Sequence, residues 1–518
     1  MCQIRPFIKS LFPDNTVAGD PQISEVFGLK TIVSKTSVIN GFAFLKSSSV
    51  TLAGFNRTFL DILNEFLDFG PLTTIDPEFK LRLYETFLRR SARQQKLGQF
   101  FTPRNVVRQM IRMARLETLK DGAVVLDPAA GVGGFVLEPP LIVPKLRNNT
   151  TFAKGQPKRR IKFIGVDVDA NTHILAKANT LIHFAEVVRD PSITIGALNQ
   201  LMAETFVLMN TNETLGSLEA PPKEIVDVIL TNPPYVTRGS AVYKDEVREA
   251  GISENGIDLR DYYDRSGLGV EAMFIRYISG ALKPDGRAFV IVPLGFLNRT
   301  DPGPKKRILD DCNLLASIAL PRNTFFNTAQ LTYILVLEKR HTAADSRPDV
   351  FCGIARTIGE TLNWERVPTP NESDLADIAD LFVKFTNGDA SAGKDAKIAK
   401  VVSADEFSEN DRWDVSRFWT EEELVELGQK ESAVERVEFI DETRTELEEI
   451  SADLETAKKE LQALTSGATK TLCMSDESFF DVRSTALALT EYLLLSNRTR
   501  QVFDTEAGKA WKPSKRPR

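Results

Sequence analysis

The spacing of apolar residues changes near residue 120. From about residue 55 to 113, apolar side chains recur three and four residues apart, as Phe59, Leu63 and Phe66 illustrate, which is the period of an amphipathic helix. From about Ala123, short apolar or β-branched runs alternate with helical stretches. The runs span residues 123–126, 163–166, 226–230, 288–292 and 333–337. Strands that alternate with helices predict an α/β fold, with a mostly parallel sheet covered on both faces.

A second pattern lies towards the C-terminus. Residues 387–393 are rich in small and polar residues, which indicates a linker or an exposed loop. Beyond them, Ile440, Leu447, Leu454 and Leu461 repeat every seven residues, with residues 443, 450, 457 and 464 at the second apolar position. About three and a half heptads predict a short coiled coil that needs a partner helix, and an ordinary amphipathic helix is the alternative. The tail from residue 509 to 518 is basic, contains prolines and is expected to be disordered.

Composition excludes several classes of protein. The 518 residues are 42% hydrophobic and 26% charged, as in ordinary globular proteins. The longest apolar runs are too short to cross a membrane, and the first residues lack the apolar core of a signal peptide. The four cysteines are far apart and the three histidines are few, so neither a disulfide framework nor a metal site is expected. We therefore expect a soluble protein of the cytoplasm.

Charge is distributed unevenly along the chain. The net charge is −6, yet residues 420–464 alone carry fifteen acidic and five basic side chains. Residues 144–162 carry seven basic side chains and no acidic one, and a further basic run includes Arg89, Arg93, Arg104 and Arg108. Such stretches can neutralise phosphates locally even on an acidic protein, and a solvated surface loop is the alternative for residues 144–162.

A glycine-rich segment follows the first expected strand. Residues 125–135, Val-Leu-Asp-Pro-Ala-Ala-Gly-Val-Gly-Gly-Phe, lead from an apolar strand into a turn, after which we expect a helix. Glycines allow the backbone to approach a ligand closely, and no lysine is present to form a phosphate-binding P-loop. The segment indicates a nucleotide-type cofactor, although a tight structural turn has the same composition.

Polar groups also end the second and third expected strands. Asp167 follows residues 163–166, where an acidic side chain can accept hydrogen bonds from ribose hydroxyls, whereas Asp169 is better placed to cap a helix. Asn232, Pro233, Pro234 and Tyr235 follow residues 226–231. An amide oxygen and a proline carbonyl can accept both hydrogens of a planar amino group, and the tyrosine offers a face on which its ring can stack. These residues predict a site for an aromatic amine.

Together these segments resemble S-adenosylmethionine-dependent amino-group methyltransferases. Residues 98–104, Gly-Gln-Phe-Phe-Thr-Pro-Arg, are similar to the cofactor-binding segment of type I restriction–modification M subunits, which are N6-adenine DNA methyltransferases. The order of the segments is that of this family, and residues 282–287 and 320–337 fit it as well. The resemblance covers roughly residues 75–340. It implies a Rossmann-like methyltransferase domain with an N-terminal helical domain and a C-terminal helical or coiled-coil region.

The resemblance also implies roles for particular residues. Asn232 and Pro233 would hold a flipped adenine in double-stranded DNA through its amino group, with Pro234 in the same rigid turn and Tyr235 stacked on the base. The residues implied to bind S-adenosylmethionine are Gln99, Phe100, Phe101, Thr102, Pro103, Arg104, Asp127, Ala129, Gly131, Val132, Gly133, Gly134 and Asp167. Three positions depart from the family pattern. Val132 stands where a threonine is common, Asp167 stands where a glutamate is more common, and residues 195–199 lack an expected acid for the cofactor adenine.

The resemblance implies four regions and a partner protein. Residues 1–115 would form the helical domain, 116–345 the catalytic domain, 346–419 a variable region and linker, and 420–518 a partner-binding region with the basic tail. A specificity subunit would complete the assembly, because the chain has no obvious domain for reading DNA sequence, and a restriction subunit would be a further partner. The alternatives are an RNA or protein-glutamine methyltransferase, and a catalytically weak scaffold in a phage-defence complex. The aromatic segment 413–419 would be either a docking element or part of the core.

Overall fold

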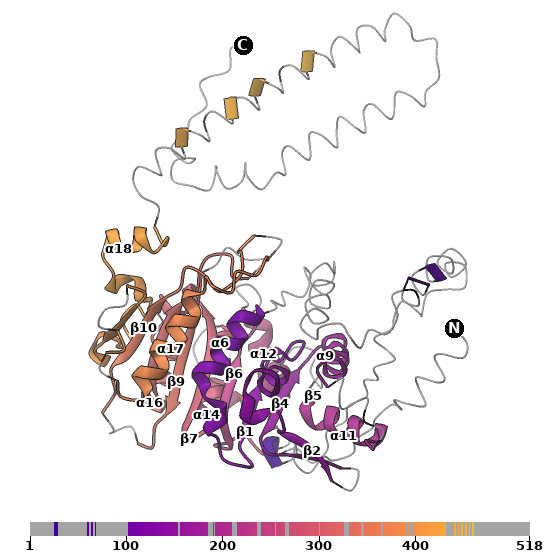
Figure 1. Ribbon diagram of the computed structural model, residues 1–518. Coiled ribbons are helices and arrows are strands. Elements are labelled where there is room, and N and C mark those ends of the chain that lie inside the picture. Colours follow the sequence, from indigo (N-terminus) through magenta and orange to yellow (C-terminus); the bar gives the residue numbers. More distant parts are fainter. Residues whose placement is uncertain are drawn as a thin grey trace, which may run out of the picture. The chain divides into compact units, whose positions relative to one another are not determined.

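The computed structural model divides the chain into two units, Met1–Lys430 and Glu431–Arg518 (Figure 1). The described residues are 25–28, scattered helical positions within 60–68 and 440–459, and most of 102–430. The gaps in the last range are 154–155, 185–189, 191, 210–214, 236–239, 254, 265–268, 300, 326–330, 343–345, 364–365, 390 and 394–396. The basic tail and most of the expected N-terminal helical stretch therefore lie outside the described residues.

A nine-stranded sheet forms the centre of the first unit as described. Its order is β11-β10-β8-β9-β7-β6-β1-β4-β5. The strands are β1 (Val124–Asp127), β4 (Lys162–Asp167), β5 (Phe206–Leu208), β6 (Val226–Thr231), β7 (Leu282–Pro293), β8 (Cys312–Ala319), β9 (Thr332–Lys339), β10 (Val350–Ile354) and β11 (Ala399–Val402). Only β9 and β11 run antiparallel to their neighbours. The expectation of a mostly parallel sheet is confirmed.

The strand order places two loops side by side. The first strand of the sheet in the sequence, β1, lies in its middle. The next two, β4 and β5, lie on one side of β1, and β6 and β7 lie on the other side. This is the order of a Rossmann-like sheet, in which ligands bind where the order reverses, beyond the carboxyl ends of the strands. Here the reversal lies between β1 and β6, so the segments after Asp127 and Thr231 meet at one edge, called the carboxyl edge below.

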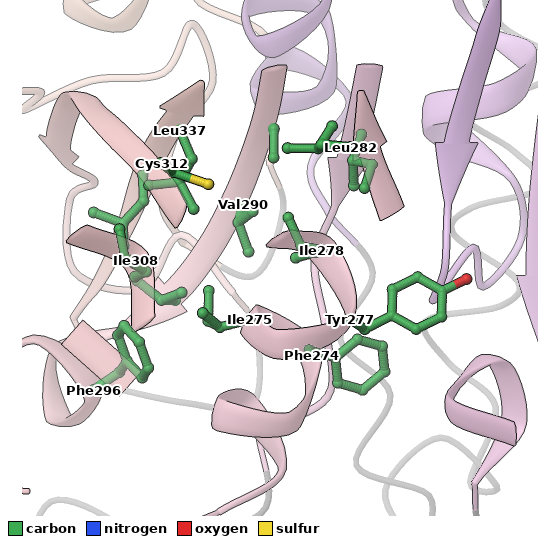
Figure 2. Packing of buried hydrophobic residues seen from close by; sticks show 14 of the residues in the cluster. Phe274, Ile275, Tyr277, Ile278, Leu282, Val290, Phe296, Ile308, Cys312 and Leu337 are labelled. Carbon is green, nitrogen blue, oxygen red and sulfur yellow. The ribbon is translucent and has the colours of Figure 1, made fainter. Parts of the chain in front are cut away.

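Helices cover both faces of the sheet. They are α6 (Arg104–Ala114), α7 (Gly134–Leu137), α8 (Pro139–Ile142), α9 (Ala170–His183), α11 (Ile195–Thr205), α12 (Ser240–Ala250), α13 (Leu259–Asp264), α14 (Val270–Ala281), α15 (Leu294–Leu297), α16 (Gly303–Asp311), α17 (Asp374–Thr386) and α18 (Glu421–Glu426). Successive side chains of β7 point to opposite faces of the sheet, so the core has two parts. Val290 packs with α14 on one face, whereas Phe289 packs with α6 and α17 on the other. Figure 2 shows the first face, where Phe274, Ile275 and Ile278 of α14 lie beneath the strands.

All five strands expected from the apolar runs are present, and four further strands join the sheet. The additional strands are β5, β8, β10 and β11. The segment 346–419 contributes β10, α17 and β11, so the sheet continues beyond residue 345. Within this segment Trp413 is fully buried and donates from Nε1 to the Ser408 carbonyl at 2.8 Å, while Trp419 is 5% exposed. The alternative that these aromatic residues pack in the core is confirmed.

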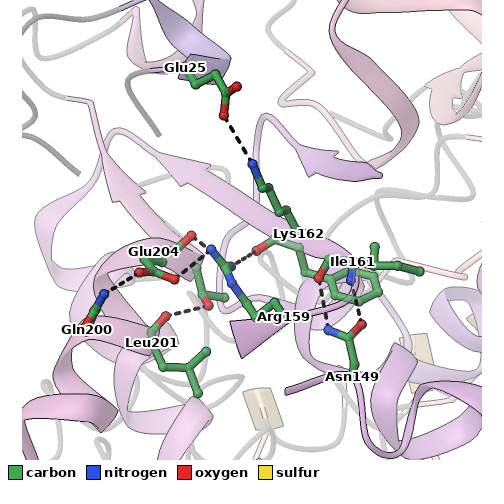
Figure 3. A network of polar contacts seen from close by, with 10 residues as sticks. Glu25, Asn149, Arg159, Ile161, Lys162, Gln200, Leu201 and Glu204 are labelled. Atoms are coloured by element: carbon green, nitrogen blue, oxygen red, sulfur yellow. Dashed lines mark hydrogen bonds and ion pairs between the residues drawn. The ribbon is translucent and has the colours of Figure 1, made fainter. Parts of the chain in front are cut away.

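The basic stretch 144–162 is partly folded into a hairpin of β2 (Thr150–Ala153) and β3 (Gln156–Arg159). Arg159 forms a buried ion pair with Glu204 at 3.0 Å, and Asn149 exchanges two hydrogen bonds with the Ile161 backbone (Figure 3). Because β4 begins at Lys162, the hairpin lies at the amino ends of the parallel strands, opposite the carboxyl edge. The expectation that this stretch is a loop that neutralises phosphates is wrong for Arg159, whose charge is already paired.

No helix among the described residues is long and apolar enough to cross a membrane. In the second unit, the described positions from Ile440 to Lys459 are helical, as the heptad pattern predicts. Ile440 and Leu447 are 37% and 41% exposed. Leu454 and Leu461 lie outside the described residues.

Candidate functional site

The glycine-rich loop after β1 is anchored by two carboxylates. Asp127 ends β1 and accepts a hydrogen bond at Oδ1 from the Ala129 backbone N–H at 3.0 Å. Asp167 ends the neighbouring β4 and accepts at Oδ2 from the Gly131 N–H at 2.9 Å. The Ala130 N–H donates to the Val166 carbonyl at 2.8 Å. The loop is therefore fixed to the ends of two strands. Four of the predicted cofactor residues lie in it, between Asp127 and Gly134: Ala129, Gly131, Val132 and Gly133.

Two glycines in this loop are required for different reasons. Gly133 has φ +87°, and a Cβ there would lie 2.4 Å from the Phe206 ring, so neither the backbone nor the packing admits a side chain. Gly131 has φ +54°, yet a Cβ there would meet no atom within 4 Å. The Val132 carbonyl accepts from Asn179 of α9 at 3.0 Å. The loop is thus closely packed on its inner side at Gly133 and open at Gly131.

The helix after the glycine loop is only one turn long. It begins at Gly134 and ends at Leu137, because Pro139 and Pro140 lack the N–H groups that would continue it. A helix is present as predicted, but it is too short to provide the extended N-terminal dipole of a phosphate site. Any ligand at this loop must be held by individual backbone groups and side chains.

Burial raises the pKa of both anchoring carboxylates. Burial raises the pKa of Asp127 from 3.8 to about 7, against the hydrogen bond from Ala129, and the nearby Asp167 charge raises it further. Burial likewise raises the pKa of Asp167 to about 7. Each Asp167 oxygen already accepts one backbone hydrogen bond, from Gly131 and from Asp169, and a carboxylate oxygen can accept two. Asp169 caps α9 by accepting from the Thr172 N–H at 2.7 Å, as predicted.

The Asn-Pro-Pro-Tyr segment follows β6 at the same edge. Asn232 donates from Nδ2 to the Thr102 hydroxyl at 3.1 Å, and its Oδ1 accepts a hydrogen bond from the Tyr235 hydroxyl. Pro233 is buried, and Pro234 is partly buried. Thr102 belongs to the upstream segment 98–104, so residues 130 positions apart in sequence meet here. The structure brings two of the sequence motifs together at one amide.

Tyr235 has a charged neighbour that the sequence did not predict. Burial raises the pKa of Tyr235 well above its usual value, and the carboxylate of Glu271 adds to the effect. Glu271 is 4% exposed, begins α14 and pairs with Arg299 at 3.0 Å. The phenol therefore stays protonated and remains a hydrogen-bond donor. Glu271 and Arg299 lack a sequence motif, and only the fold places them near Tyr235.

The remaining predicted cofactor residues fall into two groups. Gln99, Phe100 and Phe101 lie outside the described residues. Pro103 is the N-cap of α6, and Arg104 opens that helix with an ion pair to Glu138 at 3.2 Å. Arg104 thus joins α6 to the helix after the glycine loop, a contact that the sequence did not indicate.

The segment in which the family pattern would have an acid for the cofactor adenine lies in a helix. Residues 195–199 lie in α11, which begins at Ile195 and is capped by Thr194, so they do not end a strand. The third strand on this side of the sheet is β5, and the residues after Met209, at 210–214, lie outside the described part. The departure from the family pattern at residues 195–199 therefore stays a prediction.

Comparison with known proteins agrees with this arrangement. The profile of the family "N-6 DNA Methylase" matches residues 81–426. The EcoKI methylase subunit of a type I restriction enzyme from Escherichia coli is 28% identical over 278 residues, which are 52% of this chain and 46% of that protein. The StySPI methylase subunit from Salmonella potsdam is 27% identical over 277 residues. The chain spans about half the length of these curated relatives.

Solved structures are similar as well. A modification subunit of a type I restriction enzyme from Vibrio vulnificus is similar over 67% of this chain and 65% of its own, with a TM-score of 0.43 and 21% identity. A type I methyltransferase subunit from Streptococcus thermophilus covers 60% of this chain and 58% of its own, with a TM-score of 0.39 and 21% identity. The family match extends over more than half of the chain, from the residues before α6 to α18. The chain belongs to the N-6 DNA methylase family.

Proposed function

We propose that this chain transfers a methyl group from S-adenosylmethionine to the N6 amino group of adenine in DNA. The observation that carries the proposal is the meeting of Thr102, Asn232 and Tyr235 at the carboxyl edge, which also bears the glycine loop and Asp167. An amide, a proline carbonyl and an aromatic ring at such an edge suit a planar amine. Membership of the N-6 DNA methylase family supports the same chemistry.

The residues of the loop fit the cofactor. The space beside Gly131 is open, and Asp167 keeps acceptor capacity beyond its two backbone hydrogen bonds, as ribose hydroxyls require. We assign Asp167 to the ribose, and residues 129–134 to the surface along which the cofactor lies. Asp127 is 2% exposed and would support the loop from behind. When bound, S-adenosylmethionine supplies an electrophilic methyl group on its sulfonium.

Asn232 and Pro233 would orient the amine. The adenine amino nitrogen is a weak nucleophile because its lone pair is delocalised into the ring. Hydrogen bonds from this amino group to Asn232 Oδ1 and the Pro233 carbonyl would favour a tetrahedral nitrogen and direct its lone pair out of the ring plane. Tyr235 would stack on the base, an interaction worth about 1–3 kcal/mol. Most of the rate would come from positioning the two reactants, which can contribute roughly 7–11 kcal/mol.

We further propose that the chain acts as the modification subunit of a restriction–modification or phage-defence system. The relatives are named as methylase subunits of type I restriction enzymes. A separate specificity subunit would select the DNA sequence. The helical region within residues 420–518 would bind it, since the described positions Ile440 and Leu447 present partly exposed apolar side chains at heptad spacing. Residues 1–115 would form the helical domain in front of the catalytic sheet.

The test is to express the full chain in a host that lacks adenine methylation, with and without the proteins encoded beside it. Single-molecule sequencing then maps N6-methyladenine. We expect marks at a defined motif and none with Asn232→Ala, because that variant cannot accept the amino hydrogens. Cofactor binding, measured by calorimetry with S-adenosylmethionine, should remain within about threefold of wild type in the variant.

The outcomes separate the proposals. Marks that need the neighbouring protein establish the partner, whereas marks made by the chain alone overturn the need for a specificity subunit. Methylation that persists in Asn232→Ala contradicts the assigned site. A chain that binds the cofactor but marks no DNA in either setting would instead be an RNA or protein-glutamine methyltransferase or a scaffold.

A further inference from the structure

The side-chain amide of Asn232 is held at both of its ends. Its nitrogen donates to the hydroxyl of Thr102 at 3.1 Å, and its oxygen accepts from the hydroxyl of Tyr235. The two ends of an amide have nearly the same shape and opposite hydrogen-bonding roles. The contacts around an amide therefore decide which end faces a substrate.

Only the oxygen end can serve an amino group. The phenol of Tyr235 remains protonated because burial and Glu271 raise its pKa, and in the structure it donates to Oδ1. An incoming amino group is also a donor and needs the same oxygen. If Tyr235 turns its ring to stack on the base, its hydrogen bond to Asn232 is given up. Of the two described contacts of the amide, the hydrogen bond from its nitrogen to Thr102 then remains.

Thr102 is itself held firmly. Pro103, with φ −54°, follows it directly and accepts at its carbonyl from the Val107 N–H at 3.1 Å in the first turn of α6. Arg104 and Arg108 on that helix both pair with the buried Glu138, at 3.2 and 2.6 Å. The same helix buries Met110 and Ile111 in the core. The threonine hydroxyl is thus presented to Asn232 from a rigid support.

We infer that Thr102 is a positioning residue that holds the Asn232 amide with its oxygen towards the amine to be methylated. The inference rests on the proposed function and deepens it. The resemblance assigns the segment around Thr102 to the cofactor, whereas the observed contact is with the catalytic amide. Thr102 acts through Asn232 and needs no contact with either reactant.

Two substitutions separate the hydroxyl from the shape of the side chain. Thr102→Val keeps the branched shape and removes the hydroxyl, whereas Thr102→Ser keeps the hydroxyl. The full-length protein, together with its specificity partner where one is needed, is assayed on plasmid DNA from a host without adenine methylation. N6-methyladenine is measured by mass spectrometry at saturating DNA and cofactor to give kcat, and S-adenosylmethionine binding is measured separately by calorimetry.

We expect Thr102→Val to lower kcat about tenfold, as loss of one positioning hydrogen bond does. The Kd for S-adenosylmethionine should stay within about threefold of wild type. Thr102→Ser should recover most of the rate. A matched control is Thr205→Val, since the buried Thr205 donates to the Leu201 carbonyl within α11 at 2.7 Å, and α11 leads into β5, three strands away from β6 in the sheet. It should leave kcat unchanged.

Each other result overturns the inference. If Thr102→Val keeps the wild-type kcat, the hydroxyl does not position the amide. If the Kd for S-adenosylmethionine rises in proportion to the loss of rate, the hydroxyl serves the cofactor. If Thr102→Ser is as slow as Thr102→Val while both melt at the wild-type temperature, shape rather than hydrogen bonding matters. A wild-type protein that makes no N6-methyladenine contradicts the proposed function instead, which the wild-type assay reveals before any variant is compared.

Discussion

Asp127 and Asp167 combine structural support with an unfavourable electrostatic position. Both side chains accept backbone hydrogen bonds from the glycine loop, and both are buried at the ends of adjacent parallel strands. Burial raises the pKa of each carboxyl to about 7, and a nearby carboxylate adds to the effect, Asp167 for Asp127 and Asp169 for Asp167. The loop is therefore held by groups whose ionisation works against folding.

This arrangement predicts how stability depends on pH. Between about pH 4 and 7 the folded protein keeps protons that the unfolded chain releases, so these two groups make stability fall as pH rises through that range. In Asp127→Asn the side-chain oxygen can still accept from Ala129, but the group cannot ionise. We expect the variant to lose less stability than wild type between pH 5 and 7.5. Urea unfolding midpoints at the two pH values test this, and parallel losses would contradict it.

At the scale of elements, Glu138 joins three helices. It follows α7, and its carboxylate pairs with Arg104 and Arg108 of α6 and lies 3.7 Å from His183 of α9. Burial alone would raise the pKa of Glu138, but the His183 ring and the two guanidinium groups lower it to about 2. The ion pairs of Glu138 with Arg104 and Arg108 link α6, which begins just after Thr102 and Pro103, to the segment that follows the glycine loop.

Glu138→Gln should be strongly destabilising. The substitution leaves the Arg104 and Arg108 charges without their buried counterion, which costs on the order of 3–5 kcal/mol. The stabilisation that Glu138 provides is present above pH 4.5 and is lost as pH falls towards 2, the opposite direction to Asp127. The free energy of unfolding at pH 7 measures the effect.

Asp310→Asn is the matched control for this prediction. Its exposed carboxylate pairs with Lys306 one turn away on α16 at 3.3 Å, so its loss should cost about 0.5 kcal/mol or less. Equal losses for the two variants would show that the Glu138 cluster contributes no more than a surface pair.

How far the sequence predicts the fold depends on the length and isolation of each element. Runs such as 226–230 are continuous, apolar and bounded by turns, so they predict strands correctly. β5 has only three residues and follows α11 directly, so its short apolar run does not stand out from the helix before it. The sequence singled out both Thr102 and Asn232 but not their contact, because nothing local relates residues 130 positions apart. Glu271 and Arg299 near Tyr235 carry no motif at all.

At the scale of the whole sheet, the two edges should differ in their contribution to DNA binding. Arg322 is exposed just after β8, at the carboxyl edge, whereas the exposed Lys158 lies in the hairpin at the opposite edge. If DNA approaches Asn232, Arg322→Ala should weaken binding and reduce the salt dependence by roughly one phosphate contact. Lys158→Ala should change neither. Fluorescence anisotropy across salt concentrations tests this, and equal effects of the two variants would contradict it.

The position of β9 has a consequence for how the protein is made on the ribosome. β9 lies between β7 and β8, although it is the last of the three in the chain, and it pairs with both. Until Lys339 has been synthesised, the backbone N–H and C=O groups on one edge of β7 lack the partners that β9 provides, in a strand whose side chains from Ala288 to Val292 are apolar. Such edges bind other strands. Nascent chains that stall in this interval, and fragments that end before β9, should therefore depend on chaperones and aggregate without them.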